Sequence, residues 1–221
     1  MSTVYDKAID YDASITYDDI PAGIGKYNVY VDWNNDGDFL DSNEDISEDV
    51  LSMTCKIGRN FASQLTGHAV AGRLEITVRN ETGKYSPFNT SSTYAGQLLP
   101  NRKIQVGAYY PSVQPLFTGF IEKIQPNINK GRVHTATITA SGPIRKLSQT
   151  NIRVPMSTST ATGTAIGAVL DAADWPSADR SIDTGETTIT RYFYSGNALK
   201  GLREVESTES GFIKETKDGK I

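Results

Sequence analysis

Six of the acidic and amide side chains between residues 32 and 44 have the chemistry and the spacing to bind a hard cation. They are Asp32, Asn34, Asp36, Asp38, Asp41 and Glu44. The order Asp32, Asn34, Asp36, Gly37, Asp38 reproduces the first seven positions of an EF-hand loop, in which alternate oxygen ligands converge on a hard cation and glycine allows the sharp turn. The spacing therefore predicts a Ca²⁺-binding loop over residues 32–44, with these six side chains as candidate ligands.

The pattern departs from an EF-hand at its end and at its flanks. Position twelve, where a bidentate Glu is expected, is Asn43, with Glu44 one residue late and Asp41 as a second substitute. The preceding run 26–31 alternates and is rich in aromatic and β-branched residues, which predicts a strand and not a helix. A metal-free turn, in which Asp and Asn side chains bond their own backbone, is the alternative. Either interpretation favours a structural or binding protein over an enzyme.

Composition excludes several functions. The formal charge of −4 gives no basic surface for nucleic acid or an anionic membrane, so we expect neither nucleic-acid binding nor membrane insertion. The single cysteine, Cys55, rules out an intrachain disulfide, and its alternating run 51–57 predicts a small buried side chain. His68 and His134 are too far apart in sequence to suggest a zinc site. With no signal-peptide pattern at residues 1–20 and no membrane-spanning run, we expect a soluble product made in a cytoplasm.

The elements that must position the acidic loop are strands. Residues 73–79 alternate strictly between apolar and polar types, which indicates a strand with one buried face. Similar runs separated by Gly, Pro and Asn turns occupy residues 102–110, 115–124 and 133–140. Several strands at this spacing, from Tyr27 to about Lys146, predict a β-barrel or β-sandwich.

The pattern changes after Gln149. We expect a Ser/Thr-rich connector over 156–163, a helix with an apolar stripe from Ala165 to Ala173 capped by Thr162 or Thr164, and a strand over 187–194. A second helix, from an Asn197 N-cap to Gly211, precedes a hairpin over 212–221 with an Asp-Gly turn. The last strand stops after two residues, so either the natural chain continues past Ile221 or this strand pairs elsewhere, and the second domain is incomplete or leans on the first.

Read in order, these segments resemble the tail-hub or baseplate-hub proteins of tailed phages, and their relatives in type VI secretion spikes and phage-derived injection particles. The acidic loop is similar to a feature of minor tail proteins from some phages of Gram-positive hosts. The segments that carry the resemblance are 71–80, 84–88, 98–106, 116–121 with its Leu-Phe-Thr-Gly-Phe-Ile run, 137–147, 197–211 and 218–221.

The resemblance implies an α+β, mainly β, protein: an N-terminal arm at 1–22, a split β-barrel at 23–150 that contains the calcium loop 32–44, and a smaller, truncated α+β domain at 151–221. It further implies a non-enzymatic structural protein of the virion tail, which joins copies of itself in a ring, a trimer being one option. That ring would adapt the tail tube to the tip and contact neighbouring tube and tip proteins.

Two other functions remain open. One is a calcium-stiffened β-sandwich that binds carbohydrate or a cell-surface polymer through the aromatic side chains of Trp33, Tyr109 and Tyr110. The other is a host-wall hydrolase, whose active residues would lie in a continuation of the chain. Against that reading, Glu81 and Glu122 show no motif spacing to each other or to the histidines.

Overall fold

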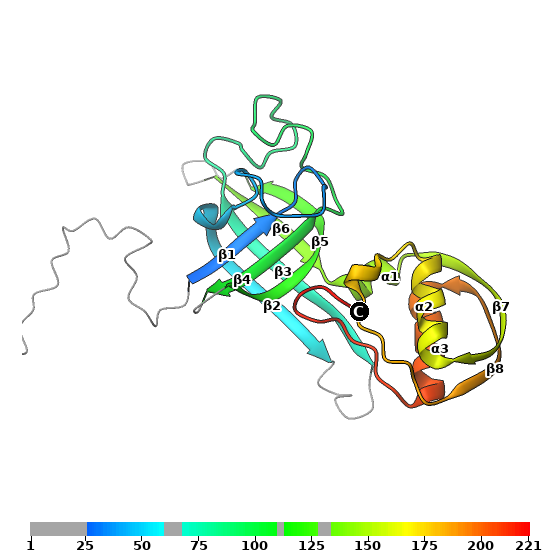
Figure 1. Cartoon of the computed structure of the whole chain (residues 1–221). Coiled ribbons are helices and arrows are strands. Elements are labelled where there is room, and N and C mark those ends of the chain that lie inside the picture. The colour runs from blue at the N-terminus through cyan, green and yellow to red at the C-terminus, as the bar shows by residue number, and fades with distance from the viewer. Residues whose placement is uncertain (1–25, 60–67, 110–112, 128–133) are drawn as a thin grey trace, which may run out of the picture.

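The computed structural model describes residues 26–59, 68–109, 113–127 and 134–221. The expected N-terminal arm at 1–22 lies outside the described residues. The described part forms a curled β-sheet with a smaller α+β layer against one side of it (Figure 1).

The large sheet has six strands in the order β1-β4-β5-β6-β3-β2, and every neighbouring pair is antiparallel. Within the described residues the two terminal strands, β1 and β2, do not pair with each other. The sheet is therefore a split barrel, and the predicted mainly β, α+β fold is confirmed. The strands are β1 Lys26–Val31, β2 Val50–Arg59, β3 Ala69–Arg79, β4 Lys103–Tyr109, β5 Val113–Asn127 and β6 Thr135–Ser141.

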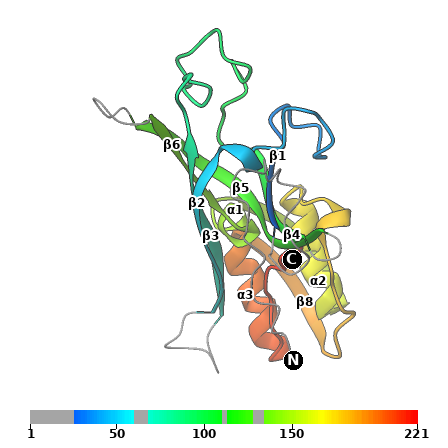
Figure 2. The same ribbon diagram turned by 90° about the vertical axis from the view of Figure 1, so that its left-hand side faces the viewer.

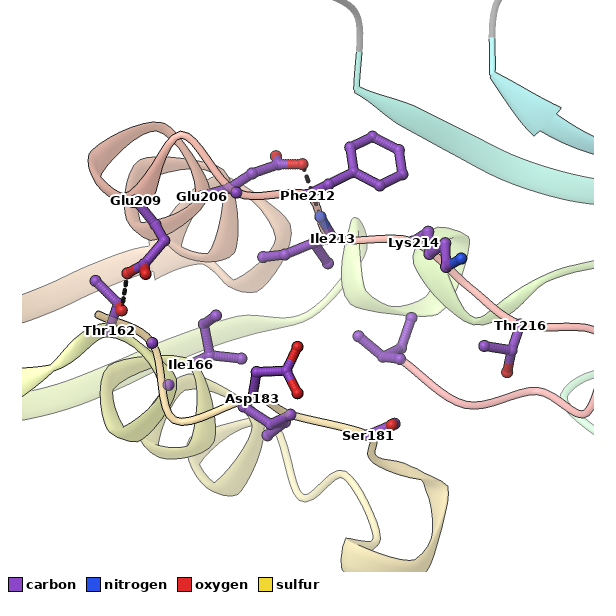
Figure 3. Close-up of a pocket in the computed structure, with 15 residues that line it drawn as sticks. Thr162, Ile166, Ser181, Asp183, Glu206, Glu209, Phe212, Ile213, Lys214 and Thr216 are labelled. Atoms are coloured by element: carbon purple, nitrogen blue, oxygen red, sulfur yellow. Dashed lines mark hydrogen bonds between the residues drawn. The ribbon is translucent and has the colours of Figure 1, made fainter. Parts of the chain in front are cut away.

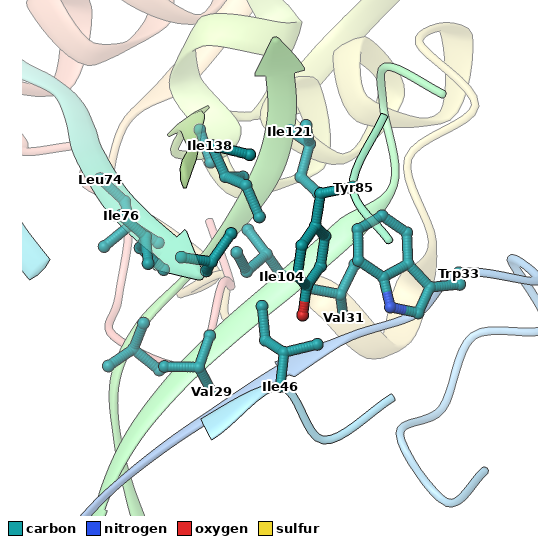
Figure 4. Close-up of a cluster of buried hydrophobic side chains, with 14 of the residues drawn as sticks. Val29, Val31, Trp33, Ile46, Leu74, Ile76, Tyr85, Ile104, Ile121 and Ile138 are labelled. Atoms are coloured by element: carbon teal, nitrogen blue, oxygen red, sulfur yellow. The ribbon is translucent and has the colours of Figure 1, made fainter. Parts of the chain in front are cut away.

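One core fills the inside of this sheet, and strand alternation builds it. On β3, Leu74, Ile76 and Val78 are fully buried while the residues between them face outward or are half-buried. Figure 4 shows side chains from the other strands pointing into the same interior, among them Ile104 of β4 and Ile138 of β6. Burying each such aliphatic side chain contributes about 1.5–3 kcal/mol, so the shared core is what holds the sheet in its curl.

The smaller layer pairs β7 with β8 and packs two helices on that ribbon (Figure 1). Its core contains Val169 and Leu170 from the helix Thr162–Ala172. Leu202 and Val205 from the helix Ala198–Glu209 belong to the same core. The bounds are α1 Pro143–Leu147, β7 Asn151–Ala161, α2 Thr162–Ala172, β8 Thr188–Asn197 and α3 Ala198–Glu209, with short 3₁₀ turns η2 at Ser47–Asp49 and η4 at Ser177–Asp179.

The connector predicted at 156–163 is wrong, because most of that segment belongs to strand β7. Thr158 and Thr160 pair with Arg191 and Ile189 of β8. The Ser/Thr composition suggested a flexible linker, but Thr is β-branched and favours strands, and a partner strand supplies the backbone hydrogen bonds. The Ser/Thr-rich composition therefore indicated that the segment is polar, but it did not predict the backbone conformation.

Helix ends follow the prediction in one case out of three. Asn197 caps α3, because its side-chain oxygen accepts a hydrogen bond from the amide of Lys200 at 3.2 Å. The N-cap of α2 is Ala161, with no side-chain cap, so neither predicted threonine caps that helix. At the end of α3, Ser210 and not Gly211 adopts the left-handed conformation, with φ of 55°.

The C-terminal segment makes the predicted turn but not the predicted strands. The amide of Thr216 donates to the carbonyl of Lys220 at 2.9 Å, across a turn in which Gly219 has φ of 84°. Ile221 instead exchanges backbone hydrogen bonds with Asp179 and Ser181. Ile221 thus pairs with a segment outside the turn, although residues 212–221 form no strand.

Cys55 is exposed, so the buried role predicted for it is wrong. It lies on β2, the last strand of the sheet, whose side chains from Thr54 to Ile57 are all exposed. Alternation in this run predicted one buried face, but the described side chains on both faces of this stretch are exposed.

A buried carboxylate joins the two layers. Glu215, in the C-terminal segment, accepts hydrogen bonds from the amide of Gly72 on β3 and from the amide of Ile144 at the start of α1, the latter at 3.2 Å. A Cβ atom on Gly72 or on Gly142 would collide with this carboxylate. Both glycines are therefore required for the close approach of the C-terminal segment to the sheet.

Further contacts support the same junction. The rings of Phe120 on β5 and Trp175 lie edge to face, 6.1 Å apart. Arg203 of α3 donates to the carbonyl of Ala69 and pairs with the buried Glu206 at 2.7 Å. Part of the outer face of the sheet is thus buried by the smaller layer.

We predict that Glu215→Ala lowers the free energy of unfolding by about 1–3 kcal/mol, because two backbone amides lose their acceptor in a buried place. Chemical denaturation of the parent and the variant measures this loss. The exposed Glu81→Ala is the matched control and should change stability little. An equal effect of the two variants would show that Glu215 does not carry the junction.

We also expect the stability difference between the parent and Glu215→Ala to depend on pH. Burial raises the pKa of Glu215, and the amides of Gly72 and Ile144 oppose this only in part. Since the folded state favours the protonated carboxyl, the contribution of Glu215 is complete below its ordinary pKa and declines as pH rises through the raised pKa. The stability lost in Glu215→Ala should therefore be larger near pH ~4 than near pH ~8.

Candidate functional site

The acidic loop begins where β1 ends and returns alongside the same strand. The amide of Asp32 donates to the carbonyl of Lys103 on β4 at 3.0 Å, which extends the pairing of β1 by one residue. On the return, the amide of Val31 donates to the carbonyl of Glu44, and that of Ile46 to the carbonyl of Val29, both at 2.9 Å. The two arms are thus held in fixed register, which places Asp32 and Glu44 close together.

Asp32 organises the turn between these arms. Its carboxylate accepts hydrogen bonds from the amides of Asn35, Asp36 and Gly37. Asn35 and Gly37 have φ of 65° and 99°, left-handed conformations that Asn tolerates and Gly adopts freely. Local hydrogen bonds from backbone amides to side chains therefore build this turn, as the metal-free interpretation expects. The same turn also brings acidic side chains of the loop close together.

Three of the predicted ligands converge. Asp32, Asp36 and Glu44 each offer a carboxylate oxygen, and these atoms all lie within 4.8 Å of one another. Asp32 and Glu44 are buried whereas Asp36 is exposed. Burial raises the pKa of Glu44; the amide of Asp41 lowers it, and the negative charges of Asp32, Asp41 and Asp36 raise it further.

The other three predicted ligands have different positions. The side-chain amide of Asn34 donates to the carboxylates of Asp36 and Asp41, at 2.8 and 2.7 Å, so Asn34 and Asp41 stand beside the cluster. Asp38 lies outside the group of three, and its carboxylate accepts from the amide of Leu40 at 2.9 Å.

A second loop packs on the acidic loop through aromatic rings. Trp33 is fully buried, with its ring centroid 4.7 Å from that of Tyr94 and 6.4 Å from that of Tyr85, and Figure 4 shows the indole beside the Tyr85 ring. Tyr94 also donates its hydroxyl to the carbonyl of Asn43 at 2.8 Å. Nothing in the sequence spacing signalled this pairing of loops 32–46 and 80–102.

The burial of Trp33 contradicts its proposed role in an aromatic platform for carbohydrate. An indole enclosed by two tyrosines has no face to offer a sugar ring. Tyr110 lies outside the described residues, and the side chain of Tyr109 does as well. Trp33 is instead part of the core that fills the barrel end.

A pocket of about 380 Å³ lies between α2, α3 and the C-terminal segment (Figure 3). Its two glutamates are held by structural partners. Glu209 accepts hydrogen bonds from Thr162 and from the amide of Glu186, and both lower its pKa, the bond from Thr162 more strongly. Glu206 pairs with Arg203 and with His68 at 2.7 Å. These hydrogen bonds and ion pairs hold the two helices against neighbouring segments.

The described residues include no helix that is both long and apolar enough to cross a membrane.

Comparison with known proteins identifies the fold. No family model matches the sequence, and no match was found among curated proteins. The structure is similar to the 43 kDa tail protein of prophage MuSo2 from Shewanella oneidensis, with a TM-score of 0.53 and 13% identity over 88% of this chain. It is also similar to the tail protein from Neisseria meningitidis MC58, with a TM-score of 0.54 and 11% identity over 89% of this chain. The chain spans about half of each, 52% and 49% respectively, and it has the fold of these phage tail proteins.

We predict that Tyr94→Phe lowers the free energy of unfolding by about 0.5–1.5 kcal/mol, the usual net value of one hydrogen bond, because the carbonyl of Asn43 loses its donor. Amide hydrogen exchange should be faster over residues 40–46, the arm that this bond holds. The exposed Tyr27→Phe serves as the control and should leave both quantities unchanged. Unchanged exchange in Tyr94→Phe would mean that the two loops are not coupled through this hydroxyl.

Proposed function

We propose that this chain is a non-enzymatic structural protein of a phage tail tip or baseplate hub, where it joins copies of itself in a ring that adapts the tail tube to the tip. The observation that carries the proposal is the likeness to two phage tail proteins over nearly nine-tenths of the chain, split barrel and smaller layer together. The net charge of −4 is compatible with a wall that must let nucleic acid or protein pass without holding it. Neighbouring tube and tip proteins are the partners that such a position requires.

The two ends of the sheet favour a head-to-tail contact between subunits. At the β1 end, residues 44–46 already form backbone hydrogen bonds with part of the edge of β1. At the β2 end, no further strand pairs with β2 within the described residues. An uncovered edge is a template for pairing with another chain, and a contact between two different surfaces closes into a ring when the rotation permits.

Apolar side chains lie exposed near the β2 edge. Leu51 and Ile57 of β2 are 47% and 38% exposed, and Val70 of the neighbouring strand is 46% exposed. Scattered single residues of this kind are ordinary, but here they accompany an unpaired strand. We infer that β2 carries the subunit contact.

The test uses Cys55, the one cysteine of the chain, which is exposed on β2. We predict concentration-dependent assembly in sedimentation velocity, and slower reaction of Cys55 with a maleimide in the assembled fraction than in the monomer. The double variant Leu51→Lys, Ile57→Lys should abolish assembly without loss of stability, because both side chains are exposed and the added charges repel.

The matched control is Met156→Lys, Phe193→Lys, which places two lysines at exposed apolar positions on the strands of the smaller layer. This variant should assemble like the parent. A parent that stays monomeric at every concentration, or a Cys55 that reacts equally fast in both fractions, would count against the β2 contact.

A further inference from the structure

Two buried carboxylates in the acidic loop have no basic partner in the part of the chain that the structure describes. Asp32 is 2% exposed and Glu44 is 1% exposed. Among the described residues, none of the ion pairs joins an acid of the 32–44 loop to a lysine, arginine or histidine. Buried charges in proteins are normally paired or bound to metal, since removing them from water is costly.

The buried carboxylate of Glu44 is also incompletely hydrogen-bonded. Its Oε2 accepts from the amide of Asp41 at 3.1 Å, but its Oε1 has no donor among the described residues. This differs from Asp32, whose two oxygens are both occupied by backbone amides. A buried, unpartnered oxygen beside two further carboxylates is free to bind a cation.

The spacing of the three acids fits one hard cation. Carboxylate oxygens bound to Ca²⁺ lie at about 2.3–2.6 Å from the ion, so two ligands on opposite sides are separated by at most about 5 Å. The oxygens of Asp32, Asp36 and Glu44 all lie within 4.8 Å of one another. The group contains neither His nor Cys, which favours Ca²⁺ over a transition metal.

We propose that Asp32, Asp36 and Glu44 bind one Ca²⁺ ion. Glu44 takes the role of the acidic residue at the end of an EF-hand loop, one position later than that pattern requires. Asn34 donates hydrogen bonds to Asp36 and Asp41 and so holds Asp36 in place from beside the three ligands. Asp38 is not a ligand through its side chain.

The ion would stiffen the end of the barrel at which two loops meet. The two arms that carry Asp32 and Glu44 are paired along β1, and Asn43 is bonded to Tyr94 of the 80–102 loop. Both views show these two loops at the same end of the sheet (Figures 1 and 2). Locking Asp32 to Glu44 therefore also fixes the arm against which the second loop packs. Ca²⁺ binding at this loop requires no contact between subunits.

The test is calorimetric titration of Ca²⁺ into the metal-stripped chain, with thermal unfolding in Ca²⁺ and in EDTA. We expect one site, and at a Ca²⁺ concentration of about one hundred times the Kd a rise of about 5–10 °C in Tm. Glu44→Gln should bind at least tenfold more weakly. The control Asp38→Asn, which removes one charge from the same loop but no ligand, should bind like the parent.

The stability difference between the parent and Glu44→Gln should change sign between EDTA and Ca²⁺, which distinguishes loss of the metal site from loss of the fold. In EDTA, Glu44→Gln should be at least as stable as the parent, because it removes an unpaired buried charge, whereas in Ca²⁺ the parent should be the more stable of the two. No heat and no shift of Tm in the folded parent would overturn the site. Equal weakening by Asp38→Asn would overturn the ligand assignment, and an equal or larger Tm shift with Mg²⁺ would overturn the choice of Ca²⁺.

Discussion

The structure depends on the need of one curled sheet to bury both of its faces. The inner face is filled by the alternating aliphatic side chains of its own strands and closed at one end by Trp33, Tyr85 and Tyr94. Part of the outer face is covered by the smaller layer, through Phe120 and the C-terminal segment. The buried carboxylate of Glu215 holds that segment against the sheet, because it accepts hydrogen bonds from backbone amides of both layers.

The same constraint leaves the two edges of the sheet unequal. The β1 edge is engaged by the returning arm of the acidic loop, so a local segment uses hydrogen bonds that another chain could have taken. The β2 edge has no such cover among the described residues, and its side chains from Thr54 to Ile57 are exposed, whereas Val50 and Met53 pack against the core. This asymmetry is the reason why we propose β2, and not β1, as the assembly surface.

Pairing along β1 also explains how an imperfect EF-hand sequence can gather its acids. In a helix-flanked loop the twelfth residue closes the site, but here the position of the closing acid is set by the register of residues 44–46 against β1. That register brings Glu44, and not Asn43, to Asp32. The carbonyl of Asn43 is directed instead to Tyr94 in the neighbouring loop.

The sequence by itself determined the strands whose one buried face produces strict alternation, such as 73–79, as well as the Asn197 cap and the order of acids in the loop. Only the tertiary structure decided that Trp33 is enclosed, that Cys55 is exposed and that Glu44 reaches Asp32. Periodicity and capping depend on neighbours within a few residues, so one chain segment suffices to predict them. Which face is covered, and which distant side chain arrives there, depends on packing between segments that lie far apart in the sequence.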